Sequence, residues 1–487
     1  MTALTFTDIF CGAGGSSTGL VAAGYELTLA ANHWARAIET HAANHRDADH
    51  ICADVSNYDM RRLPRTDVLW ASPICTEISP AGGRRRQRGQ IALELEEYGH
   101  VPDAAWERTR ATFWDVIRAT EVHRYRAVLV ENVVEAADWE LFDTWLAGMR
   151  VLGYNAQIVS VSAAHVGGSD ADMAPQWRDR IYIVLTREGV PLPDLKPRPL
   201  AWCPECGEDI RAVQSWRNGR RVGKYKQQYD YRCPNTRCRH ALVEPYVRPA
   251  ASVIDWSNVG VRIGDREAHG LRPLAANTVK RIRSGLDQLG KRRMVLTVNH
   301  GGHDGRPVPA DVAPMSTRTA KIGDAVLVPA GGQWNETSTT TAEPMRTRMA
   351  NPRGYEALLT PPQADGSFIA TQRRNGAACP VTEPVSTVAG QGRHHWLVIP
   401  YRNAATRTAG EPLHTLGTRD SAGLLEPAPV LEDCHYRMVQ PHEQLHAQRF
   451  PTDYIVHGTK GEQTMQAGNA VACNVAQWIG HRVKAVL

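Results

Sequence analysis

The sequence predicts an α/β protein whose mostly parallel sheet is interrupted by a long, β-rich insertion. Three observations support this. Short apolar segments alternate with helical segments over residues 1–188. From Pro191 the chain becomes rich in Gly, Pro, Thr and Arg, and helical spacing of apolar residues returns at about Tyr436. Strands that alternate with helices favour a parallel sheet, with ligands bound at the carboxyl ends of its strands.

The elements of the first part follow from local patterns. A glycine-rich stretch, CGAGGSS, ends the first apolar strand, and a helix is expected over Ser17–Ala23. A second strand is expected over Glu26–Asn32 and a helix over Ala35–Asn44. Further strand candidates, rich in Val, Ile and Leu, are DVLWAS, YRAVLVENV and DRIYIVL.

Composition limits the protein class. The 487 residues are 42% hydrophobic and 22% charged, which indicates a globular chain and excludes global disorder. No apolar run reaches the roughly 18–20 residues of a membrane span. The net charge of +5 does not by itself predict a nucleic-acid partner, although Arg84, Arg85, Arg86 and Arg88 form a basic cluster that permits phosphate binding.

The insertion contains a weak repeat. Each copy is an apolar strand, then a Gly/Asn/Arg loop, then an Ala/Glu-Pro-x-x-Thr site; the four sites begin at residues 313, 343, 383 and 411. Such a period suggests one supersecondary unit used several times in a β-rich array, and ordinary Thr/Pro turns are the alternative.

Polar and reactive residues follow the predicted strands. Gly12 and Gly14 lie in a turn that would let the backbone approach a ligand, unless it is only a tight strand–helix turn. Cys75 follows the strand DVLWA in the loop SPICTEIS, where a thiolate nucleophile could form, although a lone cysteine is usually a small buried hydrophobe. Glu131 follows the strand RAVLV, where partial desolvation would make its carboxyl group a usable proton donor. The alternative is that Glu131 is only a structural acid.

A fourth motif, QWRDR, leads into the strand IYIVL. Because side chains alternate along a strand, Gln176, Arg178 and Arg180 are expected on one face. Two arginines on one face could form ion pairs, or hold a base carbonyl or a phosphate.

Together these motifs resemble the DNA cytosine-5 methyltransferase family. DIFCGAGGSSTGL is similar to its first cofactor motif, SPICTEIS to its nucleophile motif, ENV to its acid motif and QWRDR to its Gln-x-Arg-x-Arg motif. YRMVQPHEQLHAQRFP resembles a late structural motif, and QAGNAVACNVA the closing cofactor motif. The resemblance covers residues 4–188 and 436–487; the middle of the chain corresponds only to the variable target-recognition region.

The resemblance implies a Rossmann-like, S-adenosylmethionine-dependent methyltransferase acting on double-stranded DNA. Cys75 would attack C6 of a flipped cytosine, Glu131 would hold N3 and the exocyclic amine, and Arg180 with Arg178 would bind the base carbonyl and nearby backbone. The implied cofactor contacts are Phe10, Gly12, Ala13, Gly14, Gly15, His33, Trp34, Asp54 and Asn469. The implied domains are 1–188 (catalytic, first part), 189–435 (target recognition, with a zinc module at 200–245 and β-rich repeats at 290–430) and 436–487 (catalytic return).

Two positions depart from the family pattern. Ile74 separates Pro73 from Cys75, and Thr76 replaces the usual Gln, which could change the loop conformation. His33 stands where a ribose-binding acid is expected, and a histidine ring is a weaker bidentate acceptor. The His33 change leaves cofactor affinity, and even the transferred group, open.

Four cysteines predict a structural zinc site. Cys203 and Cys206 form one close pair, Cys233 and Cys238 form another, and 26 residues separate the pairs. Tetrahedral Zn²⁺ needs four such ligands, as in a zinc ribbon, and His240 is expected to be a bystander. The basic, aromatic stretch between the pairs could touch DNA backbone, or the site could be only a structural staple.

The leading hypothesis is a monomeric, cytoplasmic DNA methyltransferase in a prokaryotic or virus-infected cell, as in restriction–modification, with no membrane partner. The alternatives are an RNA cytosine-5 methyltransferase and a catalytically inactive, zinc-containing DNA-binding relative. Arg and Asn residues in QRRNG, GQGRHH and YRN are candidate base readers.

Overall fold

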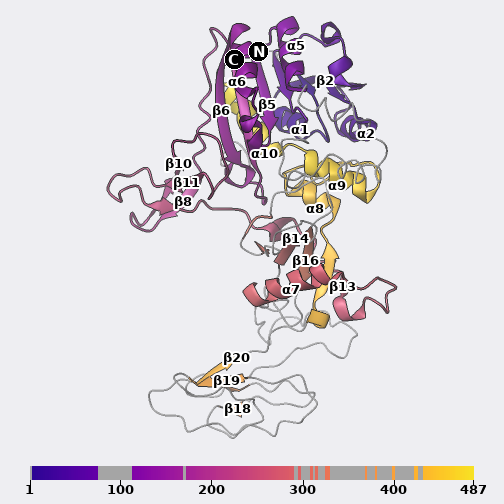
Figure 1. Ribbon diagram of the computed structural model, residues 1–487, viewed down its shortest axis with the longest axis vertical. Helices are drawn as coiled ribbons and strands as arrows, with labels where there is room; N and C mark the ends of the chain where they lie inside the picture. The colour runs from indigo at the N-terminus through magenta and orange to yellow at the C-terminus, as the bar shows by residue number, and fades with distance from the viewer. Residues whose placement is uncertain are drawn as a thin grey trace, which may run out of the picture.

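A computed structural model describes residues 3–74, 112–167, 172–289 and 431–487, with short segments between 294 and 425. The described chain forms an α/β domain, a small cysteine-containing module and an antiparallel sheet (Figure 1). The repeat sites at 343, 383 and 411, the basic cluster at 84–88 and the candidate base readers lie outside the described residues.

The α/β domain is built on a seven-stranded sheet. In spatial order its strands are β3 (Asp49–Cys52), β2 (Glu26–Asn32), β1 (Thr5–Ile9), β4 (Val68–Ala71), β5 (Ala127–Asn132), β7 (Asp179–Arg187) and β6 (Tyr154–Ser162). All neighbours pair in parallel except β7, which is antiparallel to both β5 and β6. The predicted, mostly parallel sheet is therefore confirmed.

Side-chain alternation divides the sheet's apolar residues between two cores. Val68 and Trp70 of β4 face one core, and Leu69 and Ala71 face the other. The first core is covered by α1 (Gly15–Ala22) and α10 (Cys473–Lys484), and the second by α5 (Thr112–His123) and α6 (Phe142–Val151). The sheet is thus covered by helices on both faces, as expected for strands that are apolar on both sides. Helix α2 (Ala35–Asn44) has the bounds that its sequence predicted, and α1 begins two residues before Ser17.

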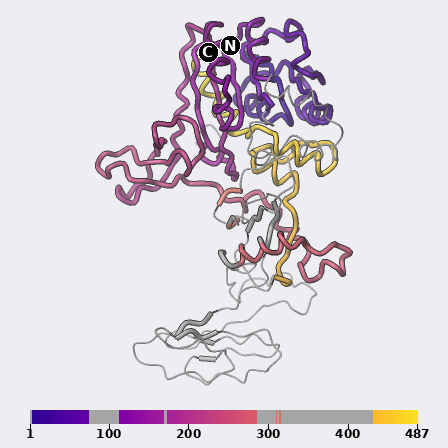
Figure 2. The backbone as a smooth tube through the Cα atoms, viewed as in Figure 1, coloured from indigo at the N-terminus to yellow at the C-terminus, as the bar shows by residue number. Residues whose placement is uncertain are grey.

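The end of the chain completes the first core. Residues of α10 pack against α1 and share the core on this face of the sheet, and the two marked termini lie close together (Figures 1 and 2). Before α10 come α8 (Pro441–His446) and α9 (Lys460–Asn469), which pack on each other. The return of helical spacing after Tyr436 therefore reflects three helices.

The insertion begins with a cysteine-containing module. A two-stranded sheet of β8 (Leu200–Cys203) and β9 (Glu208–Arg211) lies beside a three-stranded sheet of β10 (Val213–Trp216), β11 (Tyr229–Arg232) and β12 (Leu242–Val243). Figure 1 shows this module projecting from the β6 side of the α/β domain.

The rest of the insertion contributes an antiparallel five-stranded sheet and one helix. Its strand order is β13 (Val261–Arg262), β21 (His435–Met438), β16 (Asp324–Val328), β14 (Met294–Thr297) and β15 (Val308–Pro309). Helix α7 (Ala276–Leu289) lies beside β14. Two further strand pairs are β17 (Phe368–Ile369) with β18 (Cys379–Pro380) and β19 (Leu397–Pro400) with β20 (Ala422–Leu425).

Each regular element that the structure describes between residues 290 and 430 is a strand, in line with the predicted β-rich character. In the described part of the chain, no helix is long and apolar enough to cross a membrane.

Candidate active site and cysteine cluster

Three of the four sequence-predicted catalytic residues, Glu131, Arg178 and Arg180, lie at the carboxyl edge of the sheet. Ala71 at the end of β4 is in register with Val130 of β5, and Glu131 of β5 is in register with Tyr182 of β7. Because β7 runs antiparallel, its beginning, at Asp179 and Arg180, lies beside the end of β5. The structure thus brings the ENV and QWRDR motifs together.

Glu131 and Arg180 form a buried ion pair. Arg180 Nε lies 3.2 Å from Glu131 Oε1, and the two side chains are 11% and 9% exposed. Burial raises the pKa of the Glu131 carboxyl group above its usual range, while the positive charges of Arg180 and Arg178 oppose the shift. A raised pKa makes the protonated carboxyl group easier to populate, and the role of Glu131 as a proton donor stays a prediction.

Arg178 joins the QWRDR motif to the end of α9. Its Nη2 donates hydrogen bonds to the carbonyl oxygens of Gly468 (3.2 Å) and Ala470 (2.5 Å), the neighbours of Asn469. The side chain is buried. This arginine therefore holds the closing motif against the start of β7.

Cys75 lies just outside the described residues, but the two residues before it are placed. Asn132 Nδ2 donates a 2.9 Å hydrogen bond to Pro73 O, and Ile74 N donates a 3.1 Å hydrogen bond to Thr112 Oγ1. Pro73 and Ile74 are thus held beside Asn132, the residue that follows Glu131, and beside Thr112. Sequence reasoning did not give Asn132 this role; its position within ENV was the available signal.

The glycines of the glycine-rich turn have different surroundings: Gly14 and Gly15 are closely packed, whereas Gly12 is not. An alanine Cβ at Gly15 would lie 1.9 Å from Val471 O, and one at Gly14 would lie 2.5 Å from Tyr454 Oη. At Gly12, whose φ is +54°, an added Cβ would have no heavy atom of the described residues within 4 Å. Gly12 therefore borders open space in the described part of the chain, whereas Gly14 and Gly15 allow the C-terminal segment to approach. Phe10 also has a left-handed backbone (φ 63°), and Ala13 is fully buried.

The remaining cofactor candidates follow β2 and β3. Trp34 precedes α2, and its backbone N–H donates to Asn32 Oδ1 at 2.9 Å. The Asp54 carboxylate accepts hydrogen bonds from Ser56 N (3.0 Å) and Asn57 Nδ2 (2.8 Å).

His33 lies next to this carboxylate. Burial lowers the pKa of its ring, and the negative charge of Asp54 opposes the shift. The imidazole is therefore neutral at neutral pH, and its ring offers one donor and one acceptor. Asn469, at the end of α9, is exposed.

Asp8 also contacts this turn, which the sequence did not predict. Its buried carboxylate accepts hydrogen bonds from Ser16 Oγ (2.6 Å) and Ser17 Oγ (2.7 Å), which lie in the first turn of α1. Burial raises the pKa of Asp8 to about 7, despite these hydrogen bonds. Two serines after paired glycines were the only sequence signal for this contact.

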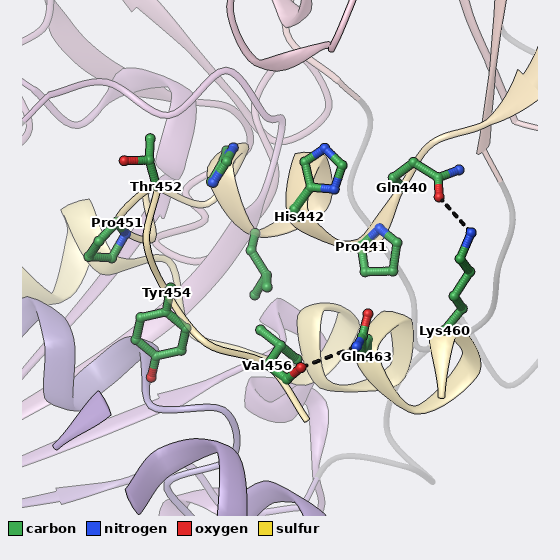
Figure 3. A pocket seen from close by; sticks show the side chains of 11 residues that line it. Gln440, Pro441, His442, Pro451, Thr452, Tyr454, Val456, Lys460 and Gln463 are labelled. Atoms are coloured by element: carbon green, nitrogen blue, oxygen red, sulfur yellow. Dashed lines mark hydrogen bonds between the residues drawn. The ribbon is translucent and has the colours of Figure 1, made fainter. Parts of the chain in front are cut away.

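A cavity of about 270 Å³ lies behind the turn, between α8, α9 and residues 451–456 (Figure 3). Tyr454 lines it and also donates a 2.5 Å hydrogen bond to Ala13 O. The lining residues are Gln440, Pro441, His442, Leu445, His446, Pro451, Thr452, Tyr454, Val456, Lys460 and Gln463. The cavity backs the cofactor turn, and Glu131 and Arg180 do not line it.

The four predicted metal ligands form one cluster. The Sγ atoms of Cys203, Cys206, Cys233 and Cys238 all lie within 4.8 Å of one another, and those of Cys206 and Cys233 are 3.9 Å apart. Zn–S bonds of about 2.3 Å in a tetrahedron require Sγ separations of roughly 3.8 Å. The donor set therefore fits a tetrahedral ion. His240 points elsewhere, because its Nδ1 lies 3.1 Å from Cys233 O.

Comparison with known proteins decides the family. The profile of the C-5 cytosine-specific DNA methylase family matches residues 4–198 and 336–485. The chain belongs to this family. Its mixed sheet and helices agree with a Rossmann-like methyltransferase fold.

The relatives of this methylase are curated bacterial enzymes. Over 193 residues it is 27% identical to the Type II methyltransferase M.AgeI of Thalassovita gelatinovora, covering 37% of this chain and 39% of that protein. Over 186 residues it is 25% identical to the Type II methyltransferase M.HgiDI of Herpetosiphon aurantiacus, covering 37% and 52%. The matches thus span about half, or less, of the relatives' length.

A solved structure titled as a putative DNA modification methyltransferase encoded within an Escherichia coli prophage aligns over 99% of both chains. The identity is 14% and the TM-score is 0.44.

Proposed function

We propose that this chain is a DNA cytosine-5 methyltransferase that modifies cytosine in a specific duplex sequence, as a Type II modification enzyme. The observation that carries the proposal is the buried Glu131–Arg180 pair, next to Asn132, which holds Pro73, two residues before Cys75 in the chain. A desolvated acid, a guanidinium group and a cysteine together provide what nucleophilic attack on a pyrimidine ring requires.

In the proposed mechanism, the Cys75 thiolate bonds to C6 of a cytosine that has left the base stack. Glu131, whose pKa burial raises, would donate a hydrogen bond from its protonated carboxyl group to N3, accept one from the exocyclic amine and stabilise the charge that develops on the ring as Cys75 attacks. Arg180 binds the base carbonyl and keeps Glu131 in place. When the proton on C5 is lost, the C5–C6 double bond re-forms and the C6–Sγ bond breaks, which returns the Cys75 thiolate.

S-adenosylmethionine, when bound, supplies the methyl group as an electrophile. Gly12 offers the open backbone surface for it, Trp34 a stacking face and Asp54 an acceptor for its adenine amine. We propose that Phe10, Ala13, His33 and Asn469 complete this site and that Gly14 and Gly15 shape it. We also propose that residues 189–435 read the target sequence between the two parts of the catalytic domain.

Bisulfite sequencing of DNA from cells expressing the protein tests the activity. Unconverted cytosines in one short sequence are expected, and they should be absent with Cys75→Ser. Full conversion with the unaltered protein would show that it does not methylate DNA. Methylation of RNA but not DNA in the purified reaction would favour the RNA alternative.

Glu131→Gln tests the acid separately. We expect at least a 100-fold loss in kcat, because the amide cannot donate the same proton. Glu140→Gln is the matched control, because Glu140 is exposed nearby. Equal activity of the two variants would remove Glu131 from the mechanism.

We further propose that the cysteine cluster holds one structural Zn²⁺, since its four thiolates fit the ion's geometry. Metal analysis of the purified full chain should give one equivalent. Cys206→Ser should lower this below half, whereas Cys52→Ser, at an exposed cysteine outside the cluster, should not. Less than half an equivalent in the unaltered protein would exclude the zinc.

A further inference from the structure

The hairpin loop of the cysteine module, residues 222–228, lies against the strand ends that carry the Glu131–Arg180 pair. Tyr225 N donates a 3.1 Å hydrogen bond to Asp179 Oδ1, at the first residue of β7. Ser160 Oγ, on β6, donates to Gly223 O at 3.1 Å. Hydrogen bonds therefore join the loop to two strands of the catalytic sheet.

The Tyr225 ring adds an aromatic contact with the QWRDR motif. It stacks on Trp177 with centroids 5.7 Å apart, and His165 meets it edge-on at 4.4 Å. His165 is buried, and burial lowers its pKa to about 3, so its ring is neutral and packs as an aromatic group. This stack holds the backbone just before Arg178.

An ion pair fixes the other side of the site. Lys224 Nζ lies 2.5 Å from Glu135 Oε1, with the side chains 32% and 24% exposed. Glu135 lies in the short 3₁₀ helix Val134–Asp138 that follows β5. Adjacent residues of one loop, Lys224 and Tyr225, therefore contact the segments that follow Glu131 and precede Arg180.

We propose that the cysteine module is a positioning element for catalysis, in which Lys224 and Tyr225 hold Arg180 against Glu131. The final link is short: Arg180 Nη1 donates to the backbone carbonyl oxygen of Asp179 at 2.9 Å, and its Nε contacts Glu131. The inference rests on the proposed function, and it gives the module a role beyond stapling the insertion.

The cysteine cluster stabilises this loop from behind. Cys203 and Cys233 pack in one core with Tyr229 and Tyr231 of β11, and Tyr225 packs against the same core. A metal ion that joins the two cysteine pairs would therefore fix the strand from which the loop extends. Loss of the ion should loosen the loop and, through Asp179, the start of β7.

Hydrogen–deuterium exchange of the full chain tests this without requiring activity. Lys224→Met and chelation of the metal should each increase exchange in residues 129–135 and 177–183 at least threefold. Glu244→Gln is the control, because it breaks the exposed Lys226–Glu244 pair within the module. Faster exchange only within residues 200–246 would overturn the inference, whether or not the protein methylates DNA.

Kinetics of the same variants separate positioning from general damage. Lys224→Met and Tyr225→Ala should lower kcat about tenfold with little change in KM for DNA, and Lys224→Arg and Tyr225→Phe should restore it. Because Arg180 lowers the pKa of Glu131, release of Arg180 should move the limb of the pH profile that requires protonated Glu131 to higher pH.

An unchanged pH profile with lower thermal stability would indicate a structural role only and would contradict the inference. An inactive unaltered protein would instead overturn the proposed function, and the exchange experiment would still decide the positioning role.

Discussion

Gly12 and Gly15 lie three residues apart in one turn, and they should respond differently to a methyl group. Gly15→Ala should lower the free energy of unfolding by about 2–3 kcal/mol, because its Cβ would meet the Val471 carbonyl oxygen. Gly12→Ala should cost only about 1 kcal/mol, from its left-handed backbone. Urea unfolding measures both.

For S-adenosylmethionine binding we expect the opposite order, with a larger effect from Gly12→Ala than from Gly15→Ala. Calorimetry should show weaker S-adenosylmethionine binding by Gly12→Ala than by the unaltered protein, because the methyl group fills open surface. Gly189→Ala is the control, since Gly189 also has a positive φ and open space, far from the turn in sequence. Equal binding by both variants would contradict the cofactor assignment of Gly12.

Asp8 makes stability depend on pH. Its folded pKa, about 7, exceeds the value near 3.8 in an unfolded chain. The folded state therefore binds the extra proton between these values, so Asp8 favours folding at low pH and this contribution disappears as pH rises through 7. The range corresponds to at most about 4 kcal/mol.

Asp8→Asn should remove this dependence. Relative to the unaltered protein, its thermal midpoint should rise steadily between pH 5 and 8. The nearby His41, whose pKa burial lowers, titrates in both proteins. Its contribution therefore cancels when their thermal midpoints are subtracted. Asp143→Asn, at an exposed aspartate, provides the control. Parallel pH curves for Asp8→Asn and the unaltered protein would show that Asp8 does not titrate in this range.

At the residue scale, the sequence predicted which residues lie close together but not which hydrogen bonds they form. Glu131, Arg180 and Pro73 were recognisable because they flank apolar strands or belong to known motifs. The Asn132–Pro73 and Asp8–Ser16 hydrogen bonds depend on side-chain directions that appear only after the turns have formed. Cys75 lies outside the described residues, so its place remains a prediction.

At the scale of elements, apolar patterning identified the central strands. Strands β4 and β5 are buried on both faces, and their continuous Val, Leu and Ala residues predict this. Strands β3 and β6 were missed. Both lie at sheet edges, and residues such as His50, Asn155 and Gln157 weaken the apolar signal that a central strand requires.

One buried ion pair connects α8 to the insertion. Arg437 of β21 donates to both carboxylate oxygens of Glu443, at 2.8 and 2.6 Å, and Asp255 N donates to the same carboxylate at 2.8 Å. The Glu443 side chain is fully buried, and that of Arg437 is 8% exposed. Strand β21 and α8 should therefore lose stability together when either partner is removed.

Glu443→Ala should lower the free energy of unfolding by about 3–5 kcal/mol, because it leaves a buried, unpaired guanidinium group. The double variant Arg437→Met/Glu443→Leu should recover much of this loss. Urea unfolding of both variants provides the measurement. Gln440 N, at the start of α8, also donates to the Glu443 carboxylate at 2.7 Å. A double variant as unstable as Glu443→Ala would show that this hydrogen bond, and not the charge pair, stabilises the region.

At the scale of the whole molecule, the sequence predicted an interrupted core but not the docking of the cysteine module. Helical spacing in GNAVACNVAQWIGHRV indicated a returning helix, and α10 packs on α1. The contacts of Tyr225 with Trp177 and Asp179 join segments whose sequences carry no mutual signal. The proposed domain limits at 188 and 436 remain predictions, and β21, at that second limit, pairs with strands of the insertion.

The shared core should behave as one cooperative unit across the whole sequence. Ile479 of α10 is fully buried, so Ile479→Ala should cost about 2–5 kcal/mol. Hydrogen exchange should accelerate in β1 and α1 as well as in α10. Ile455→Ala, at an exposed position, should leave these rates unchanged. Faster exchange in α10 alone would show that the two segments unfold independently.

The packing of α10 on α1 also sets the order of events during synthesis. Helix α1 ends at residue 22, and α10 begins at residue 473. At 5–20 residues per second, the ribosome needs roughly 20–90 s to make the intervening chain. Throughout that time, the apolar side of α1 and the strands beneath it lack their covering helix. The first core can therefore close only after the last helix has been made.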